Sequence, residues 1–170
     1  VNGMSYSGRS GKNANSAIIV SVSPADYGAQ DPLDGMHFQE TLEHKTYQLG
    51  NGKIPQQLFG DYRQNIASQG YGDFNSQTKG QTCFANLRGL MTEDMEHSFL
   101  LGMEHFSNII PQFDRSDAIL SGMETRTSSP VRIMRASSFA GAAPALCQPH
   151  GLSNRSRARR IQCTAPRSRQ

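Results

Sequence analysis

The chain has 170 residues, 36% of them hydrophobic, no tryptophan and a formal net charge of +3. This length suits one ordinary domain or a piece of a larger protein, and no apolar run approaches the roughly 18 residues of a membrane span. The first residues have neither the charged start nor the apolar core of a signal peptide, so we expect a soluble, cytoplasmic protein with no membrane partner.

The first half is predicted to contain one strand, one helix and a long surface excursion. Residues 17–22 are β-branched or small and close with Ser23 and Pro24, which predicts a buried strand. Asp34 can cap a helix over residues 35–49. Residues 53–80 hold many Gly, Gln, Asn and Ser and few apolar positions, which is typical of a long surface loop.

The second half is predicted to contain a longer helix and a second strand. Thr92 is a candidate N-cap, and an apolar stripe follows it until Pro111 stops the helix. The stripe consists of Met95, Phe99, Met103, Phe106 and Ile110. Residues 118–120 begin a strand. Two strands far apart in sequence with helices between them predict an α+β fold, a small sheet packed against helices, in which the first and last strands share the sheet.

The charges divide the chain near Arg135. Residues 1–135 carry eleven basic and fourteen acidic side chains, a net charge of −3, whereas residues 136–170 carry six Arg and no Lys, Asp or Glu. The second segment shows no sustained strand or helix period, so we predict a disordered basic tail. Two other interpretations are an Arg-rich arm for nucleic acid, which lacks interleaved aromatic residues beyond Phe139, and the product of a reading-frame error.

The pattern does not favour a metal site. His97 and His105 each follow a Met-Glu pair, but eight residues on a helix separate the two imidazoles by roughly 12 Å and about 80°. We therefore interpret these residues as a solvated polar face. Cys83, Cys147 and Cys163 include no Cys-x-x-Cys pair, so we expect reduced thiols rather than a zinc site or a disulfide framework.

Two polar segments are candidates for ligand contacts. Residues 2–17 combine Arg9, Lys12 and several Asn with glycines ahead of the first strand, but the glycine spacing fits no nucleotide motif. This segment is either a ligand-contacting loop or a turn-rich connection. Residues 124–133, ETRTSSPVRI, follow the last strand. They form either a bend that holds a carboxylate or phosphate or a salt-bridged edge with hydroxyls in a turn.

In the second segment, strand alternation would place Glu124 and Arg126 on one face within reach of an ion pair, with Thr125 and Thr127 on the other. Pro130 interrupts a central ladder, so the residues just before it should form a bend.

The segments NGMSYSGRSGKNANSAIIVSV and GMETRTSSPVRI resemble a bacterial family of uncharacterised FAD-dependent oxidoreductases, which are dehydrogenase-like flavoproteins. Between them, Asp31, Pro32, Leu33, Gly35, Phe38, Gln39, Leu42 and Glu43 match a DPL-G--FQ--LE helix. The resemblance covers about residues 2–135. It implies a two-part flavoprotein with a dinucleotide-binding FAD domain and an inserted substrate-side domain, to which residues 1–135 would belong.

The resemblance also implies FAD as cofactor and a small, possibly anionic substrate. The chain has no Gly-x-Gly-x-x-Gly turn, so we expect a fragment that is inactive alone, with residues 136–170 a separate basic tail. No general base is evident. The residues expected to face the substrate or flavin are Arg9, Asn13, Glu124, Arg126, Thr127, Ser128, Ser129 and Arg132. The alternative is a non-catalytic α+β binding module whose Arg-rich arm contacts nucleic acid or an acidic partner.

Overall fold

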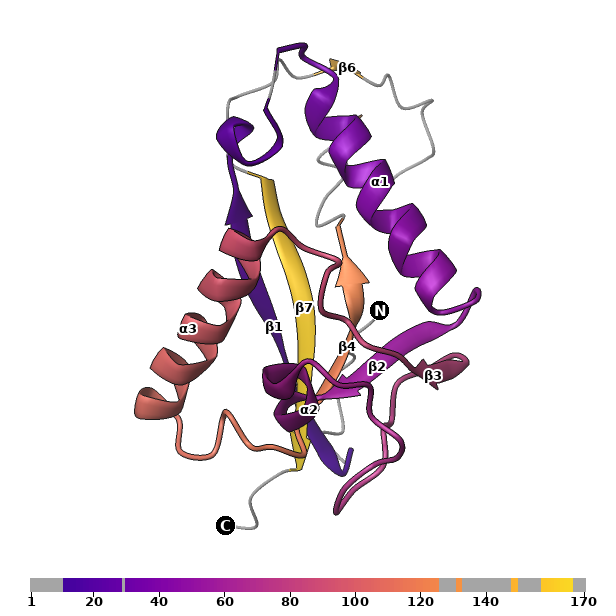
Figure 1. Ribbon diagram of the computed structural model, residues 1–170, viewed down its shortest axis with the longest axis vertical. Coiled ribbons are helices and arrows are strands. Elements are labelled where there is room, and N and C mark those ends of the chain that lie inside the picture. Colours follow the sequence, from indigo (N-terminus) through magenta and orange to yellow (C-terminus); the bar gives the residue numbers. More distant parts are fainter. Residues whose placement is uncertain (1–10, 29, 126–130, 133–147, 150–156, 167–170) are drawn as a thin grey trace, which may run out of the picture.

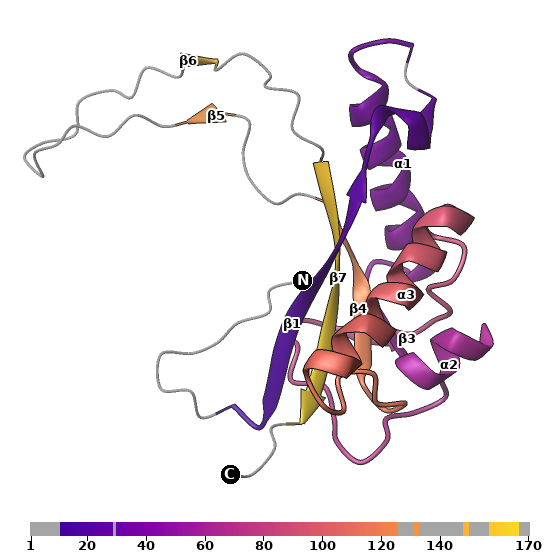
Figure 2. The ribbon, with the colours of Figure 1, turned by 90° about the vertical axis from the view of Figure 1, so that its left-hand side faces the viewer.

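The computed structural model describes residues 11–28, 30–125, 131–132, 148–149 and 157–166. It confirms the predicted α+β class: a five-stranded sheet with its helices gathered on one side (Figures 1 and 2). The elements are β1 (Asn13–Val22), the 3-10 helix η1 (Pro24–Tyr27), α1 (Asp34–Leu49), β2 (Ile54–Leu58), α2 (Phe59–Gln64), β3 (Thr82–Phe84), α3 (Glu93–Ile109), β4 (Ile119–Glu124), β5 (Val131–Arg132), β6 (Gln148–Pro149) and β7 (Arg157–Pro166).

The sheet order is β1-β7-β4-β2-β3, and β5 pairs separately with β6. The first and last predicted strands, β1 and β4, do share the sheet, but β7 lies between them and is antiparallel to both. Ten residues of the predicted basic tail thus form β7, a strand inside the sheet. Its sequence, RARRIQCTAP, has one large aliphatic side chain, Ile161, so a hydrophobic period could not reveal a strand that pairs through its backbone along both edges.

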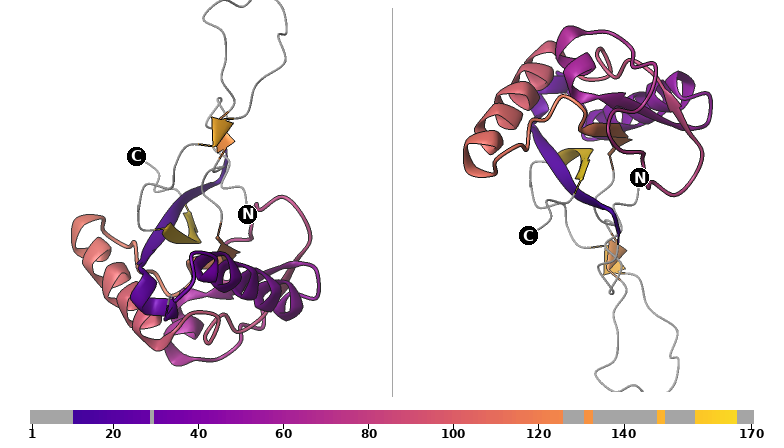
Figure 3. Two further views of the ribbon diagram at one scale, coloured as in Figure 1. Left: turned by 90° about the horizontal axis from the view of Figure 1, so that it is seen from above. Right: turned by 90° about the horizontal axis from the view of Figure 1, so that it is seen from below.

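The main core lies between the sheet and its helices. The predicted strand of residues 17–22 is present in β1, but it is buried on one face: Ile18, Val20 and Val22 are buried, whereas Ile19 is 52% exposed. The three buried residues belong to one apolar cluster with Phe59 and Tyr62 of α2 and with α3. Views from above and below show the helices together on this side of β1 and β7 (Figure 3). No helix among the described residues is long and apolar enough to cross a membrane.

The predicted helix after Thr92 is present as α3. The Thr92 hydroxyl accepts a hydrogen bond from the Met95 amide at 3.4 Å, so Thr92 is the N-cap. Met95, Phe99 and Met103 are buried, as the apolar stripe predicted. The last two residues of the stripe lie outside the core: Phe106 is 37% exposed and Ile110 is 50% exposed.

The predicted helix of residues 35–49 is present as α1, but Asp34 does not cap it. Leu33 occupies the N-cap position without a side-chain hydrogen bond. The Asp34 carboxylate instead accepts hydrogen bonds from the amides of Gln30 and Asp31, each at 2.7 Å. Asp34 therefore closes the turn before the helix rather than the first turn of the helix itself.

The prediction of an unbroken surface loop over residues 53–80 is wrong. This range contains β2 and α2, and Gln56, Gln57, Phe59 and Tyr62 are buried. The many Gly, Gln, Asn and Ser of this range predicted a surface position, but two of its Gln side chains, in the sequence IPQQL of β2, lie inside the fold. Burial is possible because each amide has hydrogen-bond partners inside the fold.

Candidate functional site

The polar segment of residues 124–133 begins at the end of a buried central strand. Ile119, Leu120 and Ser121 of β4 have no exposed surface, and the strand continues to Glu124, as predicted. Gly122 allows β4 to approach β2 closely, since a Cβ at this position would lie 2.6 Å from Pro55 Cγ. The sheet therefore holds the beginning of the segment in a fixed place.

Helix α1 also holds this strand end, through Thr125. The Gln39 side-chain amide donates to the Thr125 carbonyl at 3.1 Å, and the Thr125 hydroxyl donates to the Glu43 carboxylate. Gln39 also lies 3.5 Å from Glu43 on the same face of α1. Thr125 is only 6% exposed. We call these three residues the Thr125 tie. Gln39 and Glu43 belong to the DPL-G--FQ--LE motif, but nothing in that motif predicts their contact with residues 124–133.

The structure places some of the predicted site residues. Glu124 is the half-buried last residue of β4, and Arg132 belongs to the short strand β5, which pairs with β6. Arg9, Arg126, Thr127, Ser128 and Ser129 lie outside the described residues. The predicted bend before Pro130 and the predicted Glu124–Arg126 ion pair lie there too, so both stay predictions.

Asn13 lies at the far end of the sheet from Glu124. Asn13 pairs with Pro166 of β7, whereas Glu124 pairs with Arg160. Six residues of strand separate these positions, which corresponds to roughly 20 Å. The Asn13 side-chain amide donates to the Asn75 carbonyl at 2.9 Å, in an exposed contact. The structure therefore does not bring Asn13 and Glu124 together at one small pocket.

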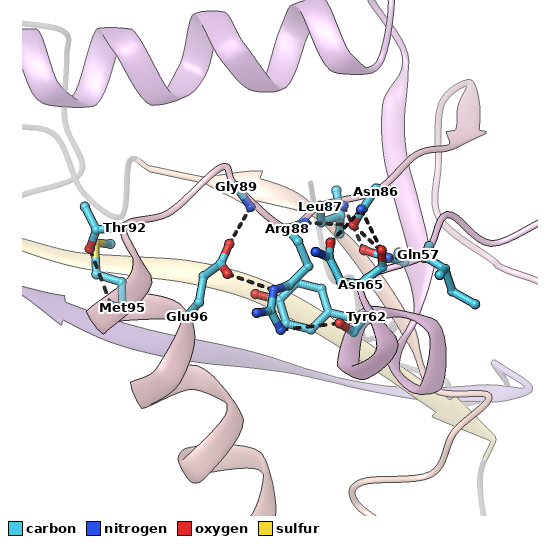
Figure 4. Close-up of polar contacts among 11 residues, drawn as sticks. Gln57, Tyr62, Asn65, Asn86, Leu87, Arg88, Gly89, Thr92, Met95 and Glu96 are labelled. Carbon is cyan, nitrogen blue, oxygen red and sulfur yellow. Dashed lines mark hydrogen bonds and ion pairs between the residues drawn. The ribbon is translucent and has the colours of Figure 1, made fainter.

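A second polar cluster, which sequence reasoning missed, joins the loop before α3 to that helix (Figure 4). Arg88 Nε lies 2.7 Å from Glu96 Oε2, an ion pair without hydrogen-bond alignment, and the Gly89 amide donates to the same carboxylate. The Glu96 side chain is 9% exposed, so the interpretation of a solvated polar face is wrong for Glu96. The sequence does contain a signal for this burial: Glu96 precedes Phe99 and Met103 by three and seven positions, so it lies on the same face of the helix as the apolar stripe.

Tyr62 lies beneath this ion pair. The Arg88 guanidinium sits 5.2 Å from the centre of the Tyr62 ring, and within the described part of the chain the buried Tyr62 hydroxyl has no hydrogen-bond partner. Burial raises the pKa of Tyr62, and the negative charge of Glu96 raises it further. The hydroxyl therefore stays protonated at physiological pH. The cluster pairs its own charges, which is typical of a structural link between a loop and a helix.

The described residues show no arrangement for a metal ion. Across the ranges that the structure describes, no three His, Cys, Asp or Glu side chains are grouped to hold one. The described residues thus contain two polar sites: the end of β4, which α1 holds at Thr125, and the Arg88–Glu96 cluster, whose charges pair with each other.

These features define a class of protein: an α+β domain that presents a polar strand end and has no metal-binding group among its described residues. The chain belongs to a family described as "FAD-dependent protein, C-terminal domain-like", whose model matches residues 1–127. It is also 41% identical over 141 residues to a protein of Clostridium beijerinckii (strain ATCC 51743 / NCIMB 8052) that bears the description "Uncharacterized protein". That match covers 81% of this chain and 26% of the relative, so the chain spans about a quarter of the relative's length.

The described residues do not form a cradle for the FAD pyrophosphate. Such a cradle is a glycine-rich turn between a strand and the first turn of a helix. At the junction of β2 with α2, a Cβ on Gly60 would lie 2.9 Å from Ser116 Cβ, so this glycine serves close packing. Between β1 and α1, Gly28 takes a positive φ of 64° at the end of η1. Neither of these two junctions therefore forms the glycine-rich turn that holds a pyrophosphate.

Proposed function

We propose that this chain is the substrate-side domain of a longer FAD-dependent oxidoreductase. The FAD-binding portion would lie in the part of the longer relatives that this chain does not span. FAD would supply the redox chemistry when bound, and this domain would bind and orient a small anionic substrate.

The observation that carries the proposal is the fixed strand end at Thr125. A buried central strand and α1 both hold this residue, and the next seven residues include Arg126, Arg132 and the hydroxyls of residues 127–129. A rigid element followed by guanidinium and hydroxyl groups is suited to binding a carboxylate or phosphate. The family match, which reaches residue 127, includes the start of this segment.

The first experiment measures flavin binding by the chain alone. Because the described residues provide no pyrophosphate cradle, the purified protein should carry no stoichiometric flavin and should bind added FAD weakly. Absorption spectroscopy after gel filtration with excess FAD measures the bound fraction. A stoichiometric yellow complex would show that the FAD site lies within this chain and would contradict the division of labour proposed here.

The second experiment uses a full-length family member that retains the ETRTSSPVR sequence. Replacement of the residue equivalent to Arg126 by Ala or Lys should lower kcat/KM strongly once a substrate is known, because Lys cannot reproduce bidentate anion binding. The flavin content of each variant serves as the control. Unchanged kinetics in both variants would remove Arg126 from the proposed site.

A further inference from the structure

We infer that the position between β1 and β4 in the sheet is an acceptor site for a β-strand from a partner segment. In this chain β7 fills the site (Figure 1). The partner is an extended segment from the part of the longer relatives that this chain does not span, and it binds by strand addition, through its backbone. The inference goes beyond the proposed function and does not depend on the anion-binding segment.

Both neighbouring strands need an occupant in this site. β1 lies at the edge of the sheet, and its ten residues pair with β7. Ile119, Leu120 and Ser121 of β4 also pair with β7, and they have no exposed surface. Buried backbone groups need hydrogen-bond partners. A strand must therefore occupy the site for β1 and β4 to belong to one sheet.

The residues that match the family contain the two neighbours of the site but not its occupant. The family model matches residues 1–127, which include β1, β2, β3 and β4. β7 begins at Arg157, outside that match. Because this chain spans 26% of its relative's length, the relative has other sequence that can supply the strand.

The register of β7 shows what kind of strand the site would bind best. Val20 and Val22 of β1 are buried in the apolar cluster, and the residues opposite them are Arg159 and Arg157. Directly opposite residues of antiparallel strands share one face of the sheet, and Arg is rarely buried without a partner. Apolar residues at these two positions would extend the core. The partner strand should therefore carry apolar side chains there.

The first experiment measures how well β7 suits the site. Arg159→Val should raise the midpoint of urea denaturation, because position 159 shares the face of the buried Val20. Arg159→Thr is the matched control, since Thr has the shape of Val but a polar hydroxyl. A midpoint for Arg159→Val at or below that of Arg159→Thr would overturn the inference.

The second experiment measures strand exchange in the full chain by fluorescence anisotropy. The probe is a labelled peptide of residues 157–166 with Arg157→Val, Arg159→Val and Cys163→Ser. It should bind at least about tenfold more tightly than the peptide that carries Cys163→Ser alone. The control is the oxidised Ser16→Cys chain, in which a disulfide to Cys163 keeps β7 in the site and should prevent binding. Equal affinity of the two peptides, undiminished binding to the control, or no binding would overturn the inference.

The third experiment identifies the source of the strand in a full-length, flavin-loaded family member. A photo-cross-linking amino acid at the position equivalent to Ala17, an exposed residue of β1, should react with the strand beside it. Mass spectrometry should identify a peptide from the part of the protein that this chain does not span. A cross-link to the part equivalent to this chain, a cross-link to a second copy, or none at all would overturn the inference. This readout is independent of substrate binding, so it separates the inference from the proposed function.

Discussion

The side-chain amide of Gln39 and the backbone carbonyl of Thr125 lie 3.1 Å apart, across 86 positions of the chain. This hydrogen bond links α1, near the start of the domain, to the end of β4. Because β4 lies in the middle of the sheet between β7 and β2, the contact connects the helix layer directly to the central strands. The polar segment that follows thus begins from a point defined by both layers.

The register of β7 can be tested with a cross-strand disulfide. Ser16 and Cys163 are direct partners in the β1–β7 pair, and the 4.5–5.5 Å between such Cα atoms suits a disulfide. Ser16→Cys should form an intramolecular bond to Cys163 under mild oxidation, identified by peptide mass spectrometry. Asn15→Cys, whose side chain points to the other face, is the control. Equal cross-linking in both variants, or none in either, would contradict this register.

The position of β7 also changes how the nucleic-acid hypothesis must be tested. Deleting residues 136–170 would remove a central strand together with the Arg-rich segment. Replacing Arg155, Arg167 and Arg169 by Gln removes positive charge on either side of β7 and leaves that strand intact. If the segment binds nucleic acid, these replacements should weaken salt-dependent association with a random oligonucleotide.

The buried Gln57 should be essential for stability. Its amide donates to the Ile66 carbonyl at 2.6 Å and to Asn86 at 3.0 Å, and its side-chain oxygen accepts from the Leu87 amide at 2.7 Å. Gln57→Leu leaves these buried groups without partners and should lower the free energy of unfolding by about 2–4 kcal/mol. Urea denaturation measures the loss. The matched change Gln48→Leu, at an exposed position, should stay within about 0.5 kcal/mol of wild type.

The Tyr62 hydroxyl should contribute nothing to stability. It is buried without a hydrogen-bond partner among the described residues, so Tyr62→Phe should leave the free energy of unfolding unchanged or raise it by up to about 1 kcal/mol. The control is Tyr71→Phe, because the Tyr71 hydroxyl donates to Gln56 at 2.7 Å, and its loss should cost about 1–2 kcal/mol. Equal destabilisation by the two changes would reveal a partner for the Tyr62 hydroxyl.

The Arg115–Asp117 pair should make stability depend on pH in the acid range. The Arg115 guanidinium donates two hydrogen bonds of 2.7 Å to Asp117 and lowers the pKa of that carboxyl below 3.8. Unfolding releases the carboxyl to its ordinary pKa, so the stabilisation is complete above about pH 4 and disappears as the pH falls through the lower folded value. Asp117→Asn should therefore destabilise by about 1 kcal/mol at pH 7 and progressively less in acid.

Thermal unfolding of wild type and Asp117→Asn between pH 7 and pH 2 checks this sign. Asp73→Asn is the control, because its side chain is 89% exposed and 3.6 Å from Arg115. A constant difference between wild type and Asp117→Asn across the whole pH range would show that the lowered pKa of Asp117 does not stabilise the fold.

Local sequence patterns predicted the elements that have strong periodicity. The Thr92 cap and the spacing of Met95, Phe99 and Met103 specify α3, because both signals act within a few turns of helix. The run of β-branched residues that closes with Ser23 and Pro24 likewise predicted β1, and the structure added that only one of its faces is buried. The burial of Gln57 has no such local signal, because it depends on hydrogen-bond partners far away in the chain.

The sequence by itself determined the α+β class, the two long helices, the strands β1 and β4, and the segments that place this chain in an FAD-dependent protein family. These properties follow from local periodicity and from strings of residues in a fixed order. Only the tertiary structure decided that β7 separates β1 from β4 and that α1 holds Thr125. Both depend on backbone and side-chain hydrogen bonds between segments distant in sequence, for which no short pattern carries the information.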